Sequence, residues 1–162
     1  MHRLLILACS QRKNPARNDL PAIDRYDGPG FRVLRKFLRE TPNSPPLVLV
    51  LSAKYGLIGS SELIPDYDYQ MSAAVAERLR PSVLKRLAIV LQSRPRRWHS
   101  IGVCVGSVYS AALIGIETVL PKGAEVEMLG GGQGRRLTRL HAWLRTQRHP
   151  TSGRRPERRH AE

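Results

Sequence analysis

Cysteine is scarce in this 162-residue sequence, which contains Cys9 and Cys104 and no others. Two cysteines cannot build a disulfide framework or a four-cysteine zinc site. The histidines show no metal-ligand spacing, so we expect neither a metal nor another cofactor. No apolar run reaches the roughly 20 residues of a membrane span, and the apolar start at Leu4–Leu7 is too short for a signal peptide. These absences predict a cytoplasmic protein with reduced thiols and no membrane partner.

Acidic residues are also in short supply, because 13 Asp and Glu stand against 27 Lys and Arg, for a formal charge of +14. Such a charge favours anionic partners, namely a nucleotide, a nucleoside or a nucleic acid. A GC-rich genome gives the same arginine content without implying any partner. Apolar residues form 41% of the chain, enough for a core. We expect a single α/β domain at residues 1–147 and a basic disordered tail at 148–162.

Four short apolar segments predict strands, at Leu4–Ala8, Leu47–Leu51, Ile101–Val105 and Ala124–Met128. Apolar residues at helical spacing predict helices at Phe31–Arg39, Ser72–Gln92, Ser107–Ile116 and around Leu137–Leu144. Pro81 predicts a kink in the second helix, or two abutting helices. The polar segments Gln11–Gly30 and Ile58–Met71 predict loops, the first with room for one helical turn. This alternation favours a three-layer, Rossmann-like domain whose mainly parallel sheet has four or more strands flanked by helices.

Each predicted strand ends in small, polar or glycine-rich sequence: Cys9-Ser10, Ser52 to Gly56, Gly106-Ser107 and Gly130 to Gly134. Ligands of open parallel sheets bind beyond the carboxyl ends of the strands, and helix starts attract phosphate. The alternative is that each glycine only makes a turn. The last segment is neither a P-loop nor a dinucleotide-binding fingerprint.

The candidate residues lie in or beside these segments. Either Arg135 or Arg136 could clamp an anion, although a solvated helix face is the alternative for each. Cations near Cys9 make a reactive thiolate plausible, whereas a cysteine ending a buried run is most often inert packing. Carboxylates beside Tyr67 could serve acid–base chemistry, bind Mg²⁺ or bond their own loop. The ligand-binding candidates are Ser10, Lys13, Ser52, Lys54, Tyr55, Gly106, Ser107, Tyr109, Gly132, Gly134 and Arg135, and the catalytic candidates are Cys9, Tyr67 and Asp68.

Two segments, Leu51-Ser-Ala-Lys-Tyr-Gly-Leu-Ile58 and Ile64-Pro-Asp-Tyr-Asp-Tyr-Gln-Met71, resemble the paired motifs of the YaaA peroxide-stress superfamily. The chain is also similar to small bacterial and phage proteins with Cys-Ser-x-x-Lys, Leu-Ser-Ala-Lys-Tyr-Gly-Leu and a final Gly-x-Gly before the last helix. The resemblance to YaaA implies an association with oxidative stress and DNA binding through a basic cleft. Asp68 stands where the YaaA-like motif leads us to expect arginine.

Two functions follow from these observations. The first is a nucleotide- or base-handling enzyme with a phosphate-binding crevice at the strand ends. It would be a metal-independent hydrolase or transferase acting on an N-glycosidic bond or exchanging a base, with Asp68 or Cys9 in proton transfer or attack. The alternative is a non-catalytic, YaaA-like DNA-binding or stress-protective protein, whose binding would fall steeply with salt.

Overall fold

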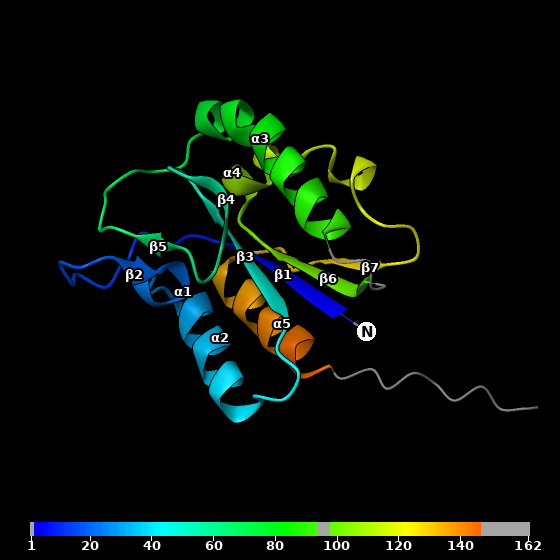
Figure 1. Cartoon of the computed structure of the whole chain (residues 1–162), viewed down its shortest axis with the longest axis horizontal. Helices are drawn as coiled ribbons and strands as arrows, with labels where there is room; N and C mark the ends of the chain where they lie inside the picture. Colours follow the sequence, from blue (N-terminus) through cyan, green and yellow to red (C-terminus); the bar gives the residue numbers. More distant parts are fainter. Residues whose placement is uncertain (1, 94–97, 147–162) are drawn as a thin grey trace, which may run out of the picture.

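The computed structural model describes residues 2–93 and 98–146 and is built around a five-stranded sheet (Figure 1). The strand order is β4-β3-β1-β6-β7. Four strands are parallel and β4 runs antiparallel to β3. The α/β class and the mainly parallel sheet are therefore confirmed. The strands are β1 (His2–Ala8), β3 (Leu47–Ser52), β4 (Gly56–Gly59), β6 (Trp98–Cys104) and β7 (Glu125–Met128).

Alternation along β1 sends successive side chains to opposite faces of the sheet. Leu5 and Leu7 pack with helices α2 (Pro29–Glu40) and α5 (Gln133–Arg145). Leu4 and Ile6 pack with helix α3 (Ala73–Gln92). All four leucine and isoleucine side chains are buried, since β1 lies in the middle of the sheet. Figure 1 shows α3 above the sheet and α2 and α5 below it.

Pro81 does not divide the second long helix, because α3 is one element from Ala73 to Gln92. The proline removes the N–H that would bond the carbonyl of Glu77, one turn earlier. Both residues are exposed, so water can satisfy that carbonyl. The start of α3 follows the usual rule, since the Ser72 hydroxyl accepts a hydrogen bond from the Val75 amide at 3.2 Å.

Two other expectations were wrong in detail. The segment Ile58–Met71 is not all loop, because Ile58 belongs to β4 and a short strand β5 (Leu63–Ile64) pairs with β2 (Leu20–Pro21). The helix expected at Ser107–Ile116 is one turn, α4 (Ser107–Ser110), followed by the 3₁₀ turns η1 (Ala111–Leu113) and η2 (Ile116–Thr118). Gly115 has a φ of 87°, which interrupts any longer helix. The predicted helical turn before α2 is α1 (Ala22–Arg25).

The fully buried Arg25 fixes the loop that precedes α1. Its guanidinium donates to the carbonyl oxygens of Asn14 (2.5 Å), Ala16 (2.9 Å) and Asn18 (2.6 Å). Two weaker bonds of 3.4 Å reach the carbonyl of Ile64 in β5. A buried cation is tolerated when its donors are satisfied in this way. The role of Arg25 is therefore to hold the loop after β1 against the rest of the chain.

The chain leaves the two central strands toward opposite faces of the sheet. β1 leads to α2, whereas β6 leads to α4 and η1, which pack with α3. Neighbouring parallel strands that diverge in this way open a crevice at their carboxyl ends. No helix within the described residues combines the length and apolar character needed to cross a bilayer. The predicted tail at 148–162 lies outside the described residues.

Candidate functional site

A cavity of about 580 Å³ opens at the carboxyl ends of β1 and β6, and we call it the strand-end cavity. Its walls come from the segment after β1, the start of α2, the segment after β6 and the start of α5. Among the described residues that line it, two are arginines and none is acidic. The polar and glycine lining residues are Cys9, Ser10, Gln11, Arg12, Gly28, Gly30, Cys104, Gly106, Tyr109, Gln133 and Arg136.

Arg136 is half-buried in the wall contributed by α5. Its guanidinium lies directly against Gly106, so closely that a β-carbon there would be 2.5 Å from Nη1. Arg136 also lies close enough to Cys104 to oppose the effect of burial, which raises the pKa of that thiol to about 11. In the described part of the chain, no carboxylate forms an ion pair with Arg136. A half-buried cation without a protein counter-ion makes the cavity receptive to an anion.

The wall formed by the loop after β1 and the start of α2 is held by hydrogen bonds around Ser10. The Ser10 hydroxyl accepts from the Gly28 amide at 3.0 Å and donates to the Arg12 carbonyl at 2.6 Å. Gly28 is required here, because a β-carbon would lie 2.6 Å from that of Ser10. These contacts tie the loop after β1 to the start of α2, whose first-turn amides carry partial positive charge.

Cys9 and Tyr109 join the two faces of the sheet at the strand ends. Cys9 packs with the α2–α5 core and Tyr109 with the α3 core. The Cys9 sulfur and the Tyr109 hydroxyl are hydrogen-bonded at 3.2 Å. Burial, followed by the proximity of Cys9, raises the pKa of Tyr109, so this phenol is neutral at pH 7. Tyr109 can therefore donate a hydrogen bond to a ligand or to the sulfur.

A smaller hollow of about 240 Å³ adjoins the strand-end cavity, and we call it the side hollow. The two share Cys9, Ser10, Gln11 and Tyr109 as lining residues. The side hollow adds polar groups of both signs from Lys13 and Asp68, together with Tyr69, Gln70 and Met71. A ligand lying across the shared wall would thus meet arginines at one end and a carboxylate at the other.

The half-buried Tyr67 is the centre of a polar cluster beside the side hollow. Its hydroxyl is hydrogen-bonded to Ser52 at 2.9 Å and to Tyr26 at 2.5 Å. Ser52 is fully buried and accepts from the amides of Lys54 and Tyr55, so its own proton points to Tyr67. Burial, the largest cause, raises the pKa of Tyr67 to about 12. This phenol is therefore neutral at pH 7.

Two lysines lie over the ring of Tyr67. The ammonium of Lys13 is 4.6 Å from the ring centroid and that of Lys54 is 5.3 Å away. The Tyr55 ring meets the Tyr67 ring edge-on, with centroids 5.3 Å apart. Ser52 and Tyr55 of the Ser-Ala-Lys-Tyr-Gly motif thus hold the Tyr67 ring on which Lys13 packs. Lys13 in turn lines the side hollow.

The structure brings many of the predicted residues together. Gly106 lines the strand-end cavity, Lys13 and Asp68 line the side hollow, and Cys9, Ser10 and Tyr109 line both. Ser52, Lys54, Tyr55 and Tyr67 form the cluster next to them. Four predicted residues lie apart from both lined volumes, and all four are exposed: Ser107, Gly132, Gly134 and Arg135.

The helical register of α5 explains why Arg136, and not its neighbour Arg135, lines the cavity. α5 begins at Gln133, so Gln133, Arg136 and Leu137 lie on one face, in line with the buried Leu140. Arg135 instead packs against Gly131, where a β-carbon would be 2.7 Å from the arginine Cδ. The spacing of Leu137, Leu140 and Leu144 carried this signal in the sequence. Arg12 and Gln133 lie within the segments that the sequence singled out, but neither was among the candidate residues.

The fold and these contacts define an α/β protein with a basic cavity at the carboxyl ends of its parallel strands. In the described ranges, no three His, Cys, Asp or Glu side chains gather as a metal site would require. The sequence model of DUF6884, a family of unknown function, matches residues 4–142, and the chain belongs to this family. A search of curated proteins finds no match.

Proposed function

We propose that this protein binds a nucleotide, with the phosphate in the strand-end cavity and the base toward the side hollow. The observation that carries the proposal is Arg136, a half-buried guanidinium in a cavity wall with no carboxylate partner among the described residues. The volume of about 580 Å³ is within the usual range for small-molecule sites. Its place beyond β1 and β6 is where open parallel sheets bind ligands. Helices on both faces of the sheet support a three-layer, Rossmann-like domain.

The proposed reaction is cleavage or exchange at the N-glycosidic bond, because the wall between the two volumes offers the groups for it. Asp68 supplies a carboxylate for attack or proton transfer, and the Cys9 thiol is the second candidate. Tyr109, held neutral, can donate a hydrogen bond to the departing base. Glycosidic chemistry of this type uses carboxylates and needs no metal.

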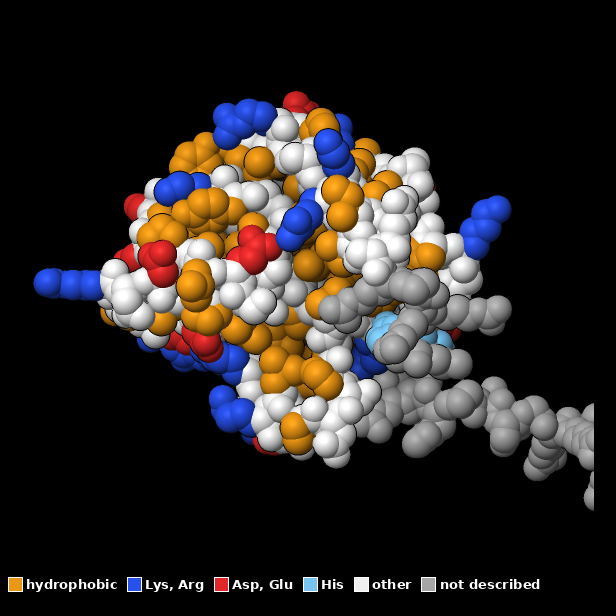
Figure 2. All heavy atoms as spheres, viewed as in Figure 1, with side chains coloured by type: hydrophobic (Ala, Val, Ile, Leu, Met, Phe, Trp, Pro, Cys, Tyr) orange, Lys and Arg blue, Asp and Glu red, His pale blue; other side chains and the backbone are white. Residues whose placement is uncertain are grey.

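The alternative proposal is a YaaA-like protein that binds DNA without catalysis, and the formal charge of +14 is its support. On the face shown in Figure 2, however, lysine and arginine side chains are scattered among acidic and apolar ones. A nucleic-acid backbone is usually met by a continuous basic stripe or patch. The face shown in Figure 2 therefore offers no support for the DNA-binding alternative.

Calorimetric titration of 5′-mononucleotides tests the binding proposal, with Arg136→Ala and Arg135→Ala as a matched pair. Both variants remove one positive charge from the same turn of α5, but only Arg136 lines the cavity. A lost charge-assisted hydrogen bond is worth about 2 kcal/mol, so Arg136→Ala should weaken binding by about 30-fold. Arg135→Ala should leave the affinity within about twofold. Equal losses in both variants, with steep salt dependence, would favour the DNA-binding alternative.

Chromatographic detection of free base after incubation with the bound mononucleotide tests the reaction. Asp68→Asn and Cys9→Ser each remove one candidate group with little change of shape. Loss of base release in one variant, with binding retained, would assign the role to that residue. Binding without any base release by the wild-type protein would refute the reaction and leave the binding proposal standing.

A further inference from the structure

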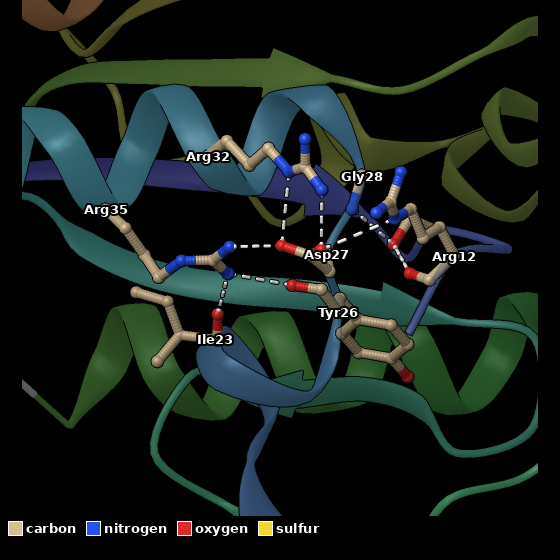
Figure 3. A network of polar contacts seen from close by, with 8 residues as sticks. Arg12, Ile23, Tyr26, Asp27, Gly28, Arg32 and Arg35 are labelled. Atoms are coloured by element: carbon tan, nitrogen blue, oxygen red, sulfur yellow. Dashed lines mark hydrogen bonds and ion pairs between the residues drawn. The ribbon is translucent and has the colours of Figure 1, made fainter. Parts of the chain in front are cut away.

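Asp27, which stands just before α2, gathers three arginine side chains (Figure 3). Arg32 and Arg35 reach it from α2, and Arg12 reaches it from the loop after β1. The shortest nitrogen–oxygen distances are 2.7 Å for Arg32, 2.6 Å for Arg35 and 3.4 Å for Arg12. One carboxylate thus faces three cations, and of these four residues Arg12 alone lines the strand-end cavity.

Arg32 and Arg35 already satisfy the carboxylate. Arg32 donates to both oxygens of Asp27, through Nε at 3.3 Å and Nη2 at 2.7 Å. Arg35 donates to one oxygen and, through its other terminal nitrogen, to the carbonyls of Ile23 and Tyr26 at 2.7 and 2.8 Å. These bonds lower the pKa of Asp27 to about 2, with the Arg32 hydrogen bond as the largest cause. Arg12 is therefore not needed to keep Asp27 ionised.

Arg12 combines a fixed backbone with a loosely held side chain. Its carbonyl accepts hydrogen bonds from the Asp27 amide at 2.9 Å and from the Ser10 hydroxyl at 2.6 Å. Its side chain is 70% exposed and has one long contact with Asp27. The residue also lines the strand-end cavity, whose α5 wall carries Arg136. An exposed ion pair of this kind contributes little, so an anion in the cavity can compete for Arg12.

We infer that Arg12 leaves Asp27 when ligand binds and, together with Arg136, clamps a phosphomonoester dianion such as the terminal phosphate of a nucleoside 5′-monophosphate. The inference rests on the proposed function for the place of the phosphate. Two guanidinium groups match the two charges and several oxygens of a monoester. A phosphodiester, as found within a nucleic acid, carries one charge and offers fewer free oxygens. The clamp therefore selects a terminal phosphate.

Methyl phosphate and dimethyl phosphate, titrated at pH 8 by calorimetry or by phosphorus NMR, are the probes. The monoester is a dianion at this pH, because its second pKa is about 6. The wild-type protein should prefer methyl phosphate by about tenfold or more, and Arg12→Ala should remove most of that preference. Arg39→Ala is the control, since Arg39 is an exposed arginine at the far end of α2. Arg39→Ala should change the affinities for methyl phosphate and dimethyl phosphate by no more than about twofold.

Two further variants test how Arg12 reaches the ligand. Asp27→Asn removes the competing carboxylate and should tighten binding of methyl phosphate by about threefold. Arg12→Lys keeps the charge but loses the planar guanidinium with its paired N–H donors. This variant should therefore retain part of the affinity for methyl phosphate and a smaller part of the preference for the monoester. Circular dichroism and thermal unfolding confirm that each variant is folded.

Several results would overturn the inference. Wild-type protein that shows no preference for the monoester would refute the dianion clamp. Arg12→Ala with wild-type affinity, alongside a weakened Arg136→Ala, would refute the role of Arg12 while the proposed function stands. Wild-type affinity in both variants would refute the cavity as the phosphate site, and with it the proposed function. A folded Asp27→Asn protein that binds more weakly would refute the exchange step.

Discussion

Replacing Gly106 by alanine tests the site without changing any charge. Gly106 has φ −78° and ψ 169°, which alanine adopts without strain. The new β-carbon would lie 2.5 Å from Nη1 of Arg136, and its three nearest neighbours all belong to that guanidinium. Because carbon and nitrogen atoms in contact lie about 3.5 Å apart, the guanidinium must retreat by about 1 Å. The backbone and the rest of the cavity wall can stay in place.

The expected effect separates binding from stability. A guanidinium displaced by about 1 Å loses a charge-assisted hydrogen bond to the ligand, which is worth about 1.5–3 kcal/mol, or roughly 10- to 150-fold in Kd. The free energy of unfolding should change by less than about 1 kcal/mol, because alanine also restricts the unfolded chain. Calorimetric titration of a 5′-mononucleotide and urea unfolding measure the two quantities on the same sample.

Gly134→Ala is the matched control for this experiment. Gly134 was a candidate ligand-binding residue, yet a β-carbon there meets no atom within 4 Å. The substitution lies in the first turn of α5, where alanine favours the helix. We expect an unchanged Kd and equal or greater stability. A folded Gly106→Ala protein that binds as tightly as the wild type would refute the assignment of the anion to Arg136.

Two further predictions concern the polar contacts that hold the segment between β1 and α2. The pKa of Asp27 lies at about 2, below its ordinary 3.8, because of Arg32 above all. Its ionised form therefore stabilises the fold at pH values above about 4, and this contribution should be lost as the pH falls toward 2. Between pH 7 and pH 2.5, the free energy of unfolding measured with urea should fall less in Asp27→Asn than in the wild type. The same fall in both proteins would contradict the stabilising role of the ionised Asp27. Arg25→Met should cost about 3 kcal/mol in urea unfolding at pH 7, since buried carbonyls lose their donor; a cost below about 1 kcal/mol would show that water replaces it.

The sequence predicts the parallel strands well because their signals are local. The runs Leu4–Ala8 and Leu47–Leu51 are apolar throughout, as strands covered on both faces must be. The edge strand β4 gave no such signal, because its four residues follow a tight turn and pair through backbone groups. At Pro81 the helix is not divided in two, and the exposed position of Glu77 lets water satisfy the carbonyl that the proline leaves without a donor.

Site residues that directly follow a strand could be predicted from the sequence. Site residues that meet only because of the order of the strands could not. Cys9, Ser10 and Gly106 could be found because each comes directly after an apolar run. Arg12 and Gln133 face the same cavity only because β1 lies beside β6 and because α2 and α5 cover the same face. Pairing between distant strands leaves no periodic trace in one sequence, so the meeting of these two residues in one cavity could not be predicted.

The order of the strands also explains why the cavity is electropositive. β1 sits between β3 and β6, and the two longer helices whose starts line the cavity, α2 and α5, both pack on the face that β1 leads to. Their amino ends lie on one side of the strand-end cavity and bring first-turn amides and Arg136 to it. The other side is closed by Tyr109, a neutral phenol from the segment after β6. In the proposed complex, the anionic end of the ligand would therefore lie toward α2 and α5, and its other end toward Tyr109 and the side hollow.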